Sequence, residues 1–541
     1  MDEMNADIII VGTGAAGLAT ALELVDQLKA ACPSILFLER EKERLGGRVH
    51  NEEKLFDFGA AYLGPAQTCI WSMVERFTGA KLSGEEGDPD TERFLYRNYW
   101  PPESVSFYQG PGRPVQWVTG NYPLPEDAEA FVTRLEVLAR AAALWIFKFG
   151  RPIWSMPGAQ GLDKLNCREL PSLLLDTPPT AELLELVDIA VRSAFSVEAT
   201  AMSALYLVEY SARCGGFQTF ENVNGTGDSH RIREGMGWLL GQIWGVLKAN
   251  GKVNLVQGDA ARVRSIEQND QGVVVTAASG TTYRAPHLVL ALSPFVHQAT
   301  AHHGNFAIGG NFVVGAQKAL AAAMIPGLTR KLFVKYDRAF WRERGQNGYG
   351  LSHGGPIDWV MDNCADHRDE DGRWIVDTAA LMVFIVADQV IPFMQKALAD
   401  QDAAILGQLA VIFGPEALNG NVIHSDSPNM FCPAGVHPPG ALTTHKVALR
   451  EPNDRVYFAA SELGINWPGG YVNGALESGR WAARRYLNDV RQMGLPLEDE
   501  ATIAGLMLPP LAPAQFGTAS PTDAAAADAF LANLIAAPLP R

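Results

Sequence analysis

The sequence predicts an α/β protein in which a parallel sheet binds a dinucleotide and a second, α+β region is inserted into that domain. Three observations predict this fold. An apolar, β-branched run at 8–11 leads into a turn with three spaced glycines. A second apolar run at 35–38 ends in an acidic residue, and strand-like runs recur at 253–256 and 288–292 between helical segments. This alternation of strands and helices is typical of a Rossmann-like domain.

The glycine turn after the first strand has the spacing of a phosphate-binding loop. Gly12 permits a tight turn, Gly14 lets the backbone approach a pyrophosphate, and Gly17 lets the next helix pack closely on the strand. That helix, expected over 15–28, directs the amides of its first turn at the phosphates. The residues expected to bind the phosphates are Gly12, Gly14, Ala15, Ala16 and Gly17.

The acidic residue after the second strand is Glu39, which Arg40 follows. A carboxylate at this distance from the glycine turn binds ribose hydroxyls and disfavours a 2′-phosphate. Strand, glycines, helix, strand and acid in this order are much more specific than the glycines alone. We therefore expect Glu39 and Arg40 beside a bound dinucleotide.

The bulk properties of the chain indicate a globular enzyme. Its 541 residues exceed one ordinary hydrophobic core, so two intertwined domains are expected. The net charge of -16 argues against nucleic acid or an anionic membrane as a partner. The six cysteines form no CxxC pair, so neither a metal site nor a disulfide scaffold is expected.

The location of the protein is also an expectation from sequence. No segment has the ~20 consecutive apolar residues that a membrane-spanning helix needs, so no transmembrane anchor is expected. The first strand begins almost at Met1, which leaves no room for a signal peptide. These features, with the scattered cysteines, predict a cytoplasmic protein.

The motifs divide the chain into stretches that return to the nucleotide-binding domain and stretches inserted between them. Helices are expected over 126–148, 180–194, 199–213 and 235–248, and strands over 331–336 and 380–386. The predicted boundaries are 1–80, 226–295 and 426–490 for the nucleotide-binding domain, 81–225 and 296–425 for a substrate-binding domain, and 491–541 for a C-terminal tail.

Two segments behind the acid identify the dinucleotide. The run Leu45-Gly46-Gly47-Arg48 and the run from Asp57 to Gln67 resemble segments of the flavin-containing amine oxidases. The resemblance implies FAD, with a monoamine-oxidase-like arrangement of the two domains. It also implies that the first run binds the diphosphate and the second passes the flavin ring. The residues it assigns to the cofactor are Gly46, Gly47, Arg48, Gly59, Ala60, Ala61 and Tyr62.

A segment near the C-terminus carries the same resemblance. Glu462, Trp467 and Tyr471 lie in a stretch similar to the carboxyl-terminal signature of the monoamine oxidases. A helix beginning near Val472 would direct its free amides at the flavin, where they stabilise the charge of the reduced ring. The resemblance implies that Glu462 and Val472 contact the cofactor. It also implies that Trp467 and Tyr471 form an aromatic wall that guides the amine.

Two further assignments follow from the resemblance. The stretch around Lys331 is similar to the family segment whose lysine holds a water near flavin N5 and assists reoxidation by oxygen. The stretch 213–225 resembles the turn that lines the substrate cavity. Glu221 or Asp228 could place a carboxylate in that cavity, but we expect both to be solvated loop acids.

Cys432 has two interpretations. Its position six residues before Pro438 matches the cysteine to which mitochondrial-type relatives attach FAD through a thioether. Pro433, however, stands where those relatives carry a second tyrosine, and a Cys-Pro pair is similar to microbial relatives that bind FAD noncovalently. We favour noncovalent FAD and keep the thioether to Cys432 as the alternative.

The sequence therefore predicts an FAD-dependent amine oxidase. Hydride from an amine passes to flavin N5, and O2 reoxidises the flavin to give H2O2 and an imine that hydrolyses to an aldehyde or ketone. Alternatives are an L-amino-acid oxidase, for which Arg213 and Arg231 are the candidate carboxylate ligands, an FAD dehydrogenase with another electron acceptor, and a non-catalytic flavoprotein. The expected partners are a small amine and O2, and a homodimer is left open.

Overall fold

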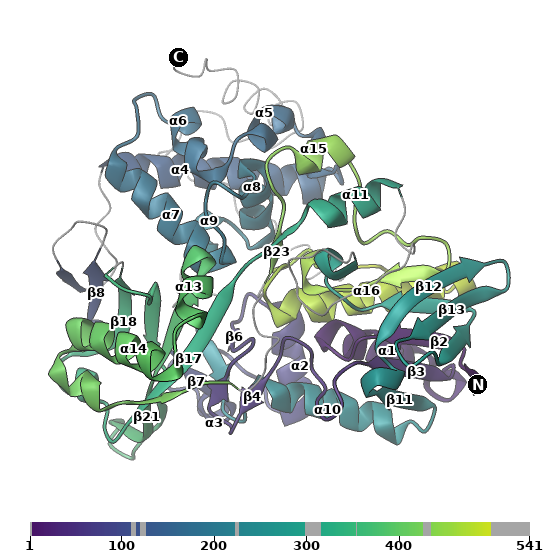
Figure 1. Ribbon diagram of the computed structural model, residues 1–541, viewed down its shortest axis with the longest axis horizontal. Coiled ribbons are helices and arrows are strands. Elements are labelled where there is room, and N and C mark those ends of the chain that lie inside the picture. The colour runs from purple at the N-terminus through teal and green to yellow at the C-terminus, as the bar shows by residue number, and fades with distance from the viewer. Residues whose placement is uncertain are drawn as a thin grey trace.

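The computed structural model describes residues 3–109, 115–119, 126–221, 227–297, 315–352, 354–425 and 434–498. Figure 1 shows three groups of elements: a sheet covered by helices at the lower right, a set of helices at the top, and a second sheet with helix α14 at the left. The first group contains the N-terminal residues and the long helix α16, which come from opposite ends of the described chain (Figure 1).

The first group is built on a five-stranded parallel sheet in the order β11-β3-β2-β15-β24. Strand β2 lies at the centre of this sheet and β3 lies beside it. Every residue of both strands is buried, as their apolar runs predict for a sheet covered on both faces. The expected strands near 8, 35, 253 and 288 are thus confirmed, and β24 pairs with β15 at the edge of the sheet. The strand bounds are β2 Ile8–Val11, β3 Ile35–Glu39, β11 Val253–Gln257, β15 His287–Leu290 and β24 Val456–Phe458.

Helices α1 (Ala15–Leu28) and α16 (Val472–Arg491) pack directly on each other beside this sheet. A Cβ on Gly479 would lie 2.2 Å from the carbonyl oxygen of Ala16, so the two backbones touch where a side chain would not fit. The Arg484 guanidinium donates to the buried Glu23 carboxylate at 2.7 Å. The two ends of the described chain are therefore fixed against each other.

Other elements complete this group. Helix α10 matches the helix expected over 235–248 and packs on α1. The remaining elements are α2 Thr68–Thr78, α3 Pro89–Phe94, α10 Met236–Ala249, β1 Glu3–Asn5, β4 Asn51–Glu52, β5 Phe56–Asp57, β6 Tyr62–Leu63, β7 Leu95–Arg97, β10 His230–Ile232, β12 Val263–Asn269, β13 Gly272–Ala277 and β14 Thr282–Ala285.

The second group is mainly helical, as predicted for the first insertion. Its apolar residues form one buried cluster, which Trp467 joins from the C-terminal part of the chain. Its elements are α4 Glu126–Ala143, α5 Ala159–Lys164, α6 Leu170–Leu174, α7 Ala181–Phe195, α8 Ala204–Arg213, α9 Phe217–Glu221, α11 Gly315–Ala323, α15 Ala441–His445, β16 Ile325–Pro326 and β23 Gly435–Val436.

The third group is an eight-stranded sheet in which the two expected strands β17 and β21 pair antiparallel. Strands β8 and β9 come from the first insertion and extend this sheet, so both insertions contribute to it. Its elements are β8 Val105–Gln109, β9 Gln116–Thr119, β17 Thr329–Tyr336, β18 Gln346–Ser352, β19 Trp359–Asp362, β20 Ala365–Arg368, β21 Trp374–Val386, β22 Asn421–Ile423, α12 Phe340–Glu343, α13 Val390–Met394 and α14 Leu398–Phe413.

These elements realise the predicted α/β fold with an inserted α+β region. The domain boundaries given above remain a proposal, and most of the assigned tail, 499–541, lies outside the described residues. Among the helices of the described residues, none combines the length and the apolar character needed to cross a membrane.

Candidate active site

The glycine turn after β2 is closed by neighbouring backbone. Gly12 has a φ of +98°, and a Cβ there would lie 2.8 Å from the carbonyl oxygen of Ala291. A Cβ on Gly17 would lie 2.2 Å from the carbonyl oxygen of Gly12. Gly14 caps α1, and no described side chain caps this helix there. The first-turn amides of Ala15, Ala16 and Gly17 thus form an end suited to an anion such as a diphosphate.

Glu39 lies against this turn. Its carboxylate is buried and accepts hydrogen bonds from the Thr13 amide at 3.0 Å and the Thr13 hydroxyl at 2.6 Å. The Glu41 amide donates to its other oxygen at 3.0 Å. Arg40 forms an ion pair with Glu41, with 3.4 Å between Nε and Oε1. The structure therefore brings the predicted acid and the glycine turn together.

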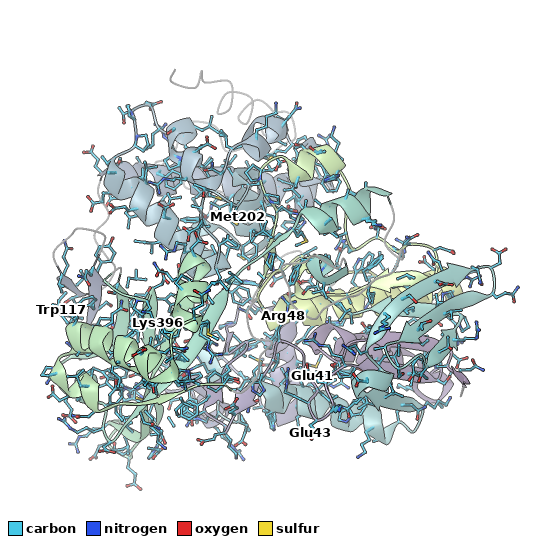
Figure 2. All side chains as sticks on the ribbon, viewed as in Figure 1. Glu41, Glu43, Arg48, Trp117, Met202 and Lys396 are labelled. Atoms are coloured by element: carbon cyan, nitrogen blue, oxygen red, sulfur yellow. The ribbon has the colours of Figure 1, made fainter. Side chains whose placement is uncertain are left out.

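The Gly46-Gly47-Arg48 run also lies at this turn. Gly46 forms a bridge with Gly14, and Arg48 donates to Glu462 at 2.7 and 3.0 Å and to the Ser461 hydroxyl at 3.0 Å. Burial pushes the pKa of Glu462 upward, but the Arg48 charge and the hydrogen bonds that the carboxylate accepts together outweigh burial, so this pKa lies below its ordinary value. Figure 2 shows Arg48 near the middle of the molecule. We call Gly12–Gly17, Glu39, Gly46–Arg48 and Glu462 the glycine clamp.

The segment expected to pass the flavin ring follows the clamp. A Cβ on Gly59 would lie 2.0 Å from the Arg48 carbonyl oxygen, and the Ala60 amide donates to that same oxygen at 3.3 Å. Ala61 is buried, and the Tyr62 hydroxyl donates to the sulfur of Met361 at 3.3 Å. This segment therefore connects the clamp with the eight-stranded sheet.

Tyr471 and Trp467 lie together before α16. Tyr471 is the residue that precedes Val472 at the N-terminus of this helix, which is where the sequence predicts a helix start. The two rings meet edge to face, with centroids 5.1 Å apart and planes at 81°. Trp467 is 1% exposed and has a φ of +48°, a conformation that costs a non-glycine residue about 1–2 kcal/mol. Such strain persists where surrounding contacts impose it, and it concentrates at functional sites.

Lys331 reaches the flavin segment from strand β17. Its Nζ donates to the carbonyl oxygens of Asp57 at 2.9 Å and Gly59 at 2.5 Å, and it lies 5.1 Å from the ring centroid of Phe384. Burial lowers the pKa of Lys331 to about 8, although the Asp57 carboxylate opposes this shift. Burial raises the pKa of Asp57 to about 7, against the hydrogen bond from the Met236 amide.

Asp228 corrects one expectation. It is half-buried rather than solvated, and its Oδ2 accepts a hydrogen bond from the Tyr471 hydroxyl at 3.1 Å. Burial raises its pKa to about 6, while the Tyr471 hydrogen bond and the Lys331 charge lower it. The expectation failed because a loop position carries no periodic signal that reports burial. We call Asp57, Asp228, Lys331 and Tyr471 the titratable cluster.

A signal for Asp228 was nevertheless present in the sequence. The residue stands two positions before β10, and Arg231 of β10 pairs across the ladder with Tyr62 of the flavin segment. Recognising that pairing would have placed Asp228 near the segment that the resemblance assigns to the flavin ring. The side chain of Glu221 and the whole of Cys432 lie outside the described residues, so the structure gives neither a position.

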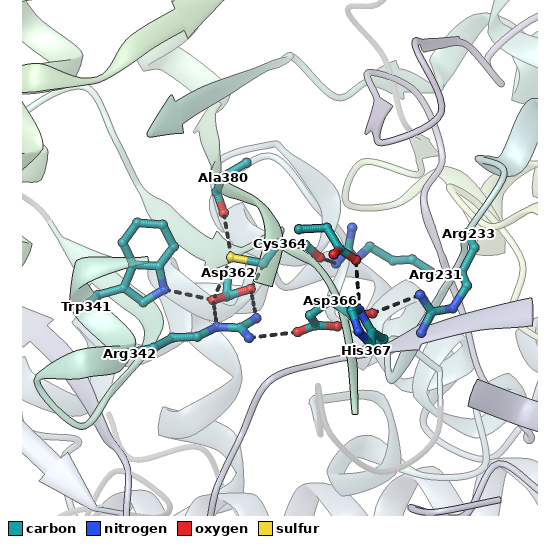
Figure 3. A network of polar contacts seen from close by, with 10 residues as sticks. Arg231, Arg233, Trp341, Arg342, Asp362, Cys364, Asp366, His367 and Ala380 are labelled. Atoms are coloured by element: carbon teal, nitrogen blue, oxygen red, sulfur yellow. Dashed lines mark hydrogen bonds and ion pairs between the residues drawn. The ribbon is translucent and has the colours of Figure 1, made fainter. Parts of the chain in front are cut away.

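Both arginines proposed for an amino-acid carboxylate have other partners. Arg213 donates two hydrogen bonds to Glu209, at 3.1 and 2.7 Å. Arg231 is buried and donates to the Asn363 side chain at 2.6 Å and to the Cys364 carbonyl at 3.2 Å. Figure 3 shows Arg231 beside the network in which Arg342 binds Asp362 and Asp366.

A dinucleotide-binding sheet joined through a buried lysine and an aromatic pair to an inserted domain defines a flavin-dependent oxidoreductase. A family model described as flavin containing amine oxidoreductase matches residues 15–487. The chain belongs to this family, and it is a flavoprotein oxidoreductase that acts on amines.

Relatives agree with this assignment. The chain is 26% identical over 518 residues to flavin-containing amine oxidase B of Homo sapiens, covering 92% of this chain and 88% of that protein. It is 26% identical to flavin-containing amine oxidase of Danio rerio, covering 89% and 85%. Among solved structures, a putrescine oxidase with putrescine bound shares the fold at a TM-score of 0.72 and 22% identity, covering 90% of this chain and 100% of that one. The cyclohexylamine oxidase of Brevibacterium oxydans IH-35A also shares the fold, at a TM-score of 0.72 and 22% identity, covering 90% of this chain and 99% of that one.

Proposed function

We propose that this chain binds FAD noncovalently and oxidises an amine at the carbon beside its nitrogen, with O2 as the final electron acceptor. The observation that carries the proposal is the convergence of Lys331, Tyr471 and Asp228. They come from three distant stretches of the chain, and they lie beside the segment 57–62 that leaves the glycine clamp. Perturbed titratable groups of this kind cluster at functional sites.

The residues of the clamp fit an FAD diphosphate and ribose. The helix α1 offers its amides without a side-chain cap from the described residues, and Gly14 leaves room for close approach of a phosphate. When bound, FAD supplies the oxidant that accepts hydride at N5 and passes the electrons to O2. The residues we assign to it are Gly12, Gly14, Ala15, Ala16, Gly17, Glu39, Arg40, Gly46, Gly47, Arg48, Gly59, Ala60, Ala61, Tyr62, Glu462 and Val472.

Tyr471 contacts and orients the amine in this proposal, and Trp467 is a positioning residue. The Trp467 ring is buried and holds the Tyr471 ring edge to face. The amine must lose its proton before hydride leaves, because an ammonium has no lone pair to support the cleavage of the C–H bond. Burial beside these rings favours the neutral amine, since desolvation lowers the pKa of an ammonium.

Lys331 assists the oxygen half of the reaction. Its charge is held by two backbone carbonyls and not by a bonded carboxylate among the described residues. A cation at this position stabilises the negative charge that oxygen acquires when it takes up an electron. The products are H2O2 and an imine, and water converts the imine into an aldehyde or ketone and ammonia or a smaller amine.

A peroxide-coupled screen of primary, secondary and polyamines beside L-amino acids tests the proposal. We expect peroxide with at least one amine and none with amino acids, because Arg213 and Arg231 already bind other groups. Anaerobic mixing with the same amine should bleach the flavin. A flavin that bleaches but reacts sluggishly with oxygen would favour the dehydrogenase alternative, and no bleaching with any amine would refute the proposal.

The noncovalent attachment has its own test. Acid precipitation should leave the yellow colour in the supernatant, both for the native protein and for Cys432→Ser. Colour that stays with the precipitated native protein and leaves the precipitated variant would establish the thioether to Cys432 instead.

A further inference from the structure

We propose that the Asp228 carboxylate binds an alkylammonium group of the substrate and thereby selects amines over amino acids. This inference rests on the proposed function, since it names a specificity residue of that same site. The sequence motifs do not include Asp228, and the assignment comes from its contacts.

The position of Asp228 is fixed by packing on both sides. A Cβ on its neighbour Gly227 would lie 2.2 Å from the Trp467 ring, so the loop lies directly on the aromatic pair. The Asn98 side-chain amide donates to the Asp228 carbonyl at 2.6 Å, and the Asn98 backbone amide donates to the Ser229 carbonyl at 3.0 Å. The carboxylate is therefore held against the wall that, in the proposed function, guides the substrate.

The charge of Asp228 is incompletely balanced. The Tyr471 hydroxyl donates one hydrogen bond to it, which keeps the carboxylate in place but supplies no positive charge. In the described ranges, no lysine, arginine or histidine forms an ion pair with Asp228. The nearest influential cation is Lys331, whose Nζ donates instead to the carbonyls of Asp57 and Gly59.

The other groups that face Asp228 are weak acids. Tyr62, Tyr210 and Cys214 all feel its charge, and burial raises the pKa of each of them, so they stay neutral. Burial raises the pKa of Asp228 itself to about 6, which leaves it ionised at neutral pH. A desolvated anion without a bonded counterion gains most from a cation that arrives with the substrate.

This charge also discriminates between substrates. An amino acid would bring its own carboxylate toward Asp228, and two like charges brought together at a binding site repel each other. Arg213 is already paired with the Glu209 carboxylate. Arg231 keeps its charge, but its two terminal nitrogens donate to the Asn363 side chain and the Cys364 carbonyl. An alkylammonium pairs with Asp228 without that penalty.

A binding experiment tests the inference without turnover. The FAD-loaded protein is titrated with tert-butylammonium, whose α-carbon carries no hydrogen, and binding is followed by calorimetry and by the flavin absorbance. Asp228→Asn retains an oxygen that accepts from Tyr471 but removes the charge, and we expect it to bind roughly 30-fold more weakly. Asp337→Asn, which neutralises an exposed acid, should bind like the native protein.

Two further measurements guard the interpretation. Asp228→Glu keeps the charge and should retain most of the affinity, which separates charge from packing. Thermal melting of all three variants identifies any loss of folding. Affinity of Asp228→Asn within twofold of the native value, in a folded protein, would overturn the inference.

A last comparison identifies which nitrogen Asp228 binds. Butylamine and 1,4-diaminobutane are compared as substrates of native protein and Asp228→Asn. A rise in KM for both amines assigns Asp228 to the reacting nitrogen in the ammonium form that binds first, before this nitrogen loses its proton. A rise for the diamine alone assigns Asp228 to the second ammonium. Absence of flavin bleaching with charge-dependent binding intact would refute the proposed function but not this site. Bleaching with unchanged KM for both amines would refute the site alone.

Discussion

The glycine clamp and the titratable cluster differ in how their charged groups are compensated. In the clamp, buried charges are paired: Arg48 binds Glu462, and backbone and hydroxyl donors bind Glu39. In the cluster, buried charges are only partly compensated, and the pKa values of Asp57, Lys331 and Asp228 move toward neutrality. This difference supports the proposal that the clamp binds the cofactor and that the cluster takes part in the chemistry.

The largest expected effect is a difference in stability between two glycine substitutions in the clamp. Gly17→Ala places a methyl 2.2 Å from the Gly12 carbonyl, and we expect it to destabilise the protein by about 3 kcal/mol or more. Gly14→Ala meets nothing nearer than 3.8 Å and has an ordinary φ of -67°, so the apoprotein should melt normally. Its FAD affinity should still fall by roughly tenfold or more, because the methyl blocks the approach of the phosphate.

Thermal melts of the apoproteins and flavin titrations measure these two effects separately. Equal destabilisation by the two substitutions would contradict the view that Gly14 is kept open for a ligand.

Breaking the ion pair in the clamp should have the next largest effect. Arg48→Met leaves the buried Glu462 side chain without its ion-pair partner, which should lower the free energy of unfolding by about 3 kcal/mol. The double variant Arg48→Met/Glu462→Gln should recover part of that loss, because no charge stays buried. Urea unfolding of the apoproteins checks this. A double variant no more stable than Arg48→Met would show that the charge of Glu462 is not the cause.

In the cluster, Lys331→Met should slow reoxidation of the reduced flavin by oxygen about 100-fold, since the cation that stabilises the developing charge is lost. Anaerobic reduction by the amine should change much less. Lys335→Met, an exposed lysine on the same strand, serves as the matched control and should alter neither step. Stopped-flow measurement of each half-reaction decides, and equal slowing of both would argue for a structural role of Lys331.

The two pKa shifts in the cluster predict opposite pH dependences. Lys331 is a cation below its pKa of about 8, so the rate of reoxidation should fall as pH rises through about 8. Asp228 is an anion above its pKa of about 6, so affinity for tert-butylammonium should fall as pH drops through about 6. Titrations and stopped-flow traces from pH 5 to 10 check both limbs. If the change in rate near pH 8 persists in Lys331→Met, or the change in affinity near pH 6 persists in Asp228→Asn, that change belongs to another titratable group.

The smallest effect should come from Tyr471→Phe. The ring stays edge to face on Trp467, but the hydroxyl that donates to Asp228 is lost. We expect KM for amines to rise about fivefold, the equivalent of one ordinary hydrogen bond. The low-pH limb should move to higher pH, because that hydrogen bond lowers the pKa of Asp228. If the loss of affinity at low pH stays at the same pH in Tyr471→Phe, the Tyr471 hydroxyl does not influence the pKa of Asp228.

Much of this arrangement was predictable because its signals are local. A tight glycine turn, a β-branched strand and the start of a helix each depend on a few adjacent residues. The close backbone packing at Gly12 and Gly17 and the helix start at Val472 were therefore predicted from the sequence. The strands β17 and β21 were also found, although β8 and β9, which extend the same sheet beyond β18, were not. The pairing of β8 with β18 joins segments far apart in the chain, and no local sequence pattern predicts it.

The sequence by itself determined the family, the glycine turn at the start of α1 and the elements that carry the candidate residues, because these follow from spacing along the chain. Only the tertiary structure decided which side chains meet. It pairs Arg48 with Glu462 across 414 positions and Tyr471 with Asp228 across 243. Burial and partners set the charge of a group, and both are fixed by how distant segments pack. The sequence offered Asp228 only as one of two acids near the cavity turn. Its hydrogen bond with Tyr471 is what makes it the carboxylate that we expect to choose the substrate.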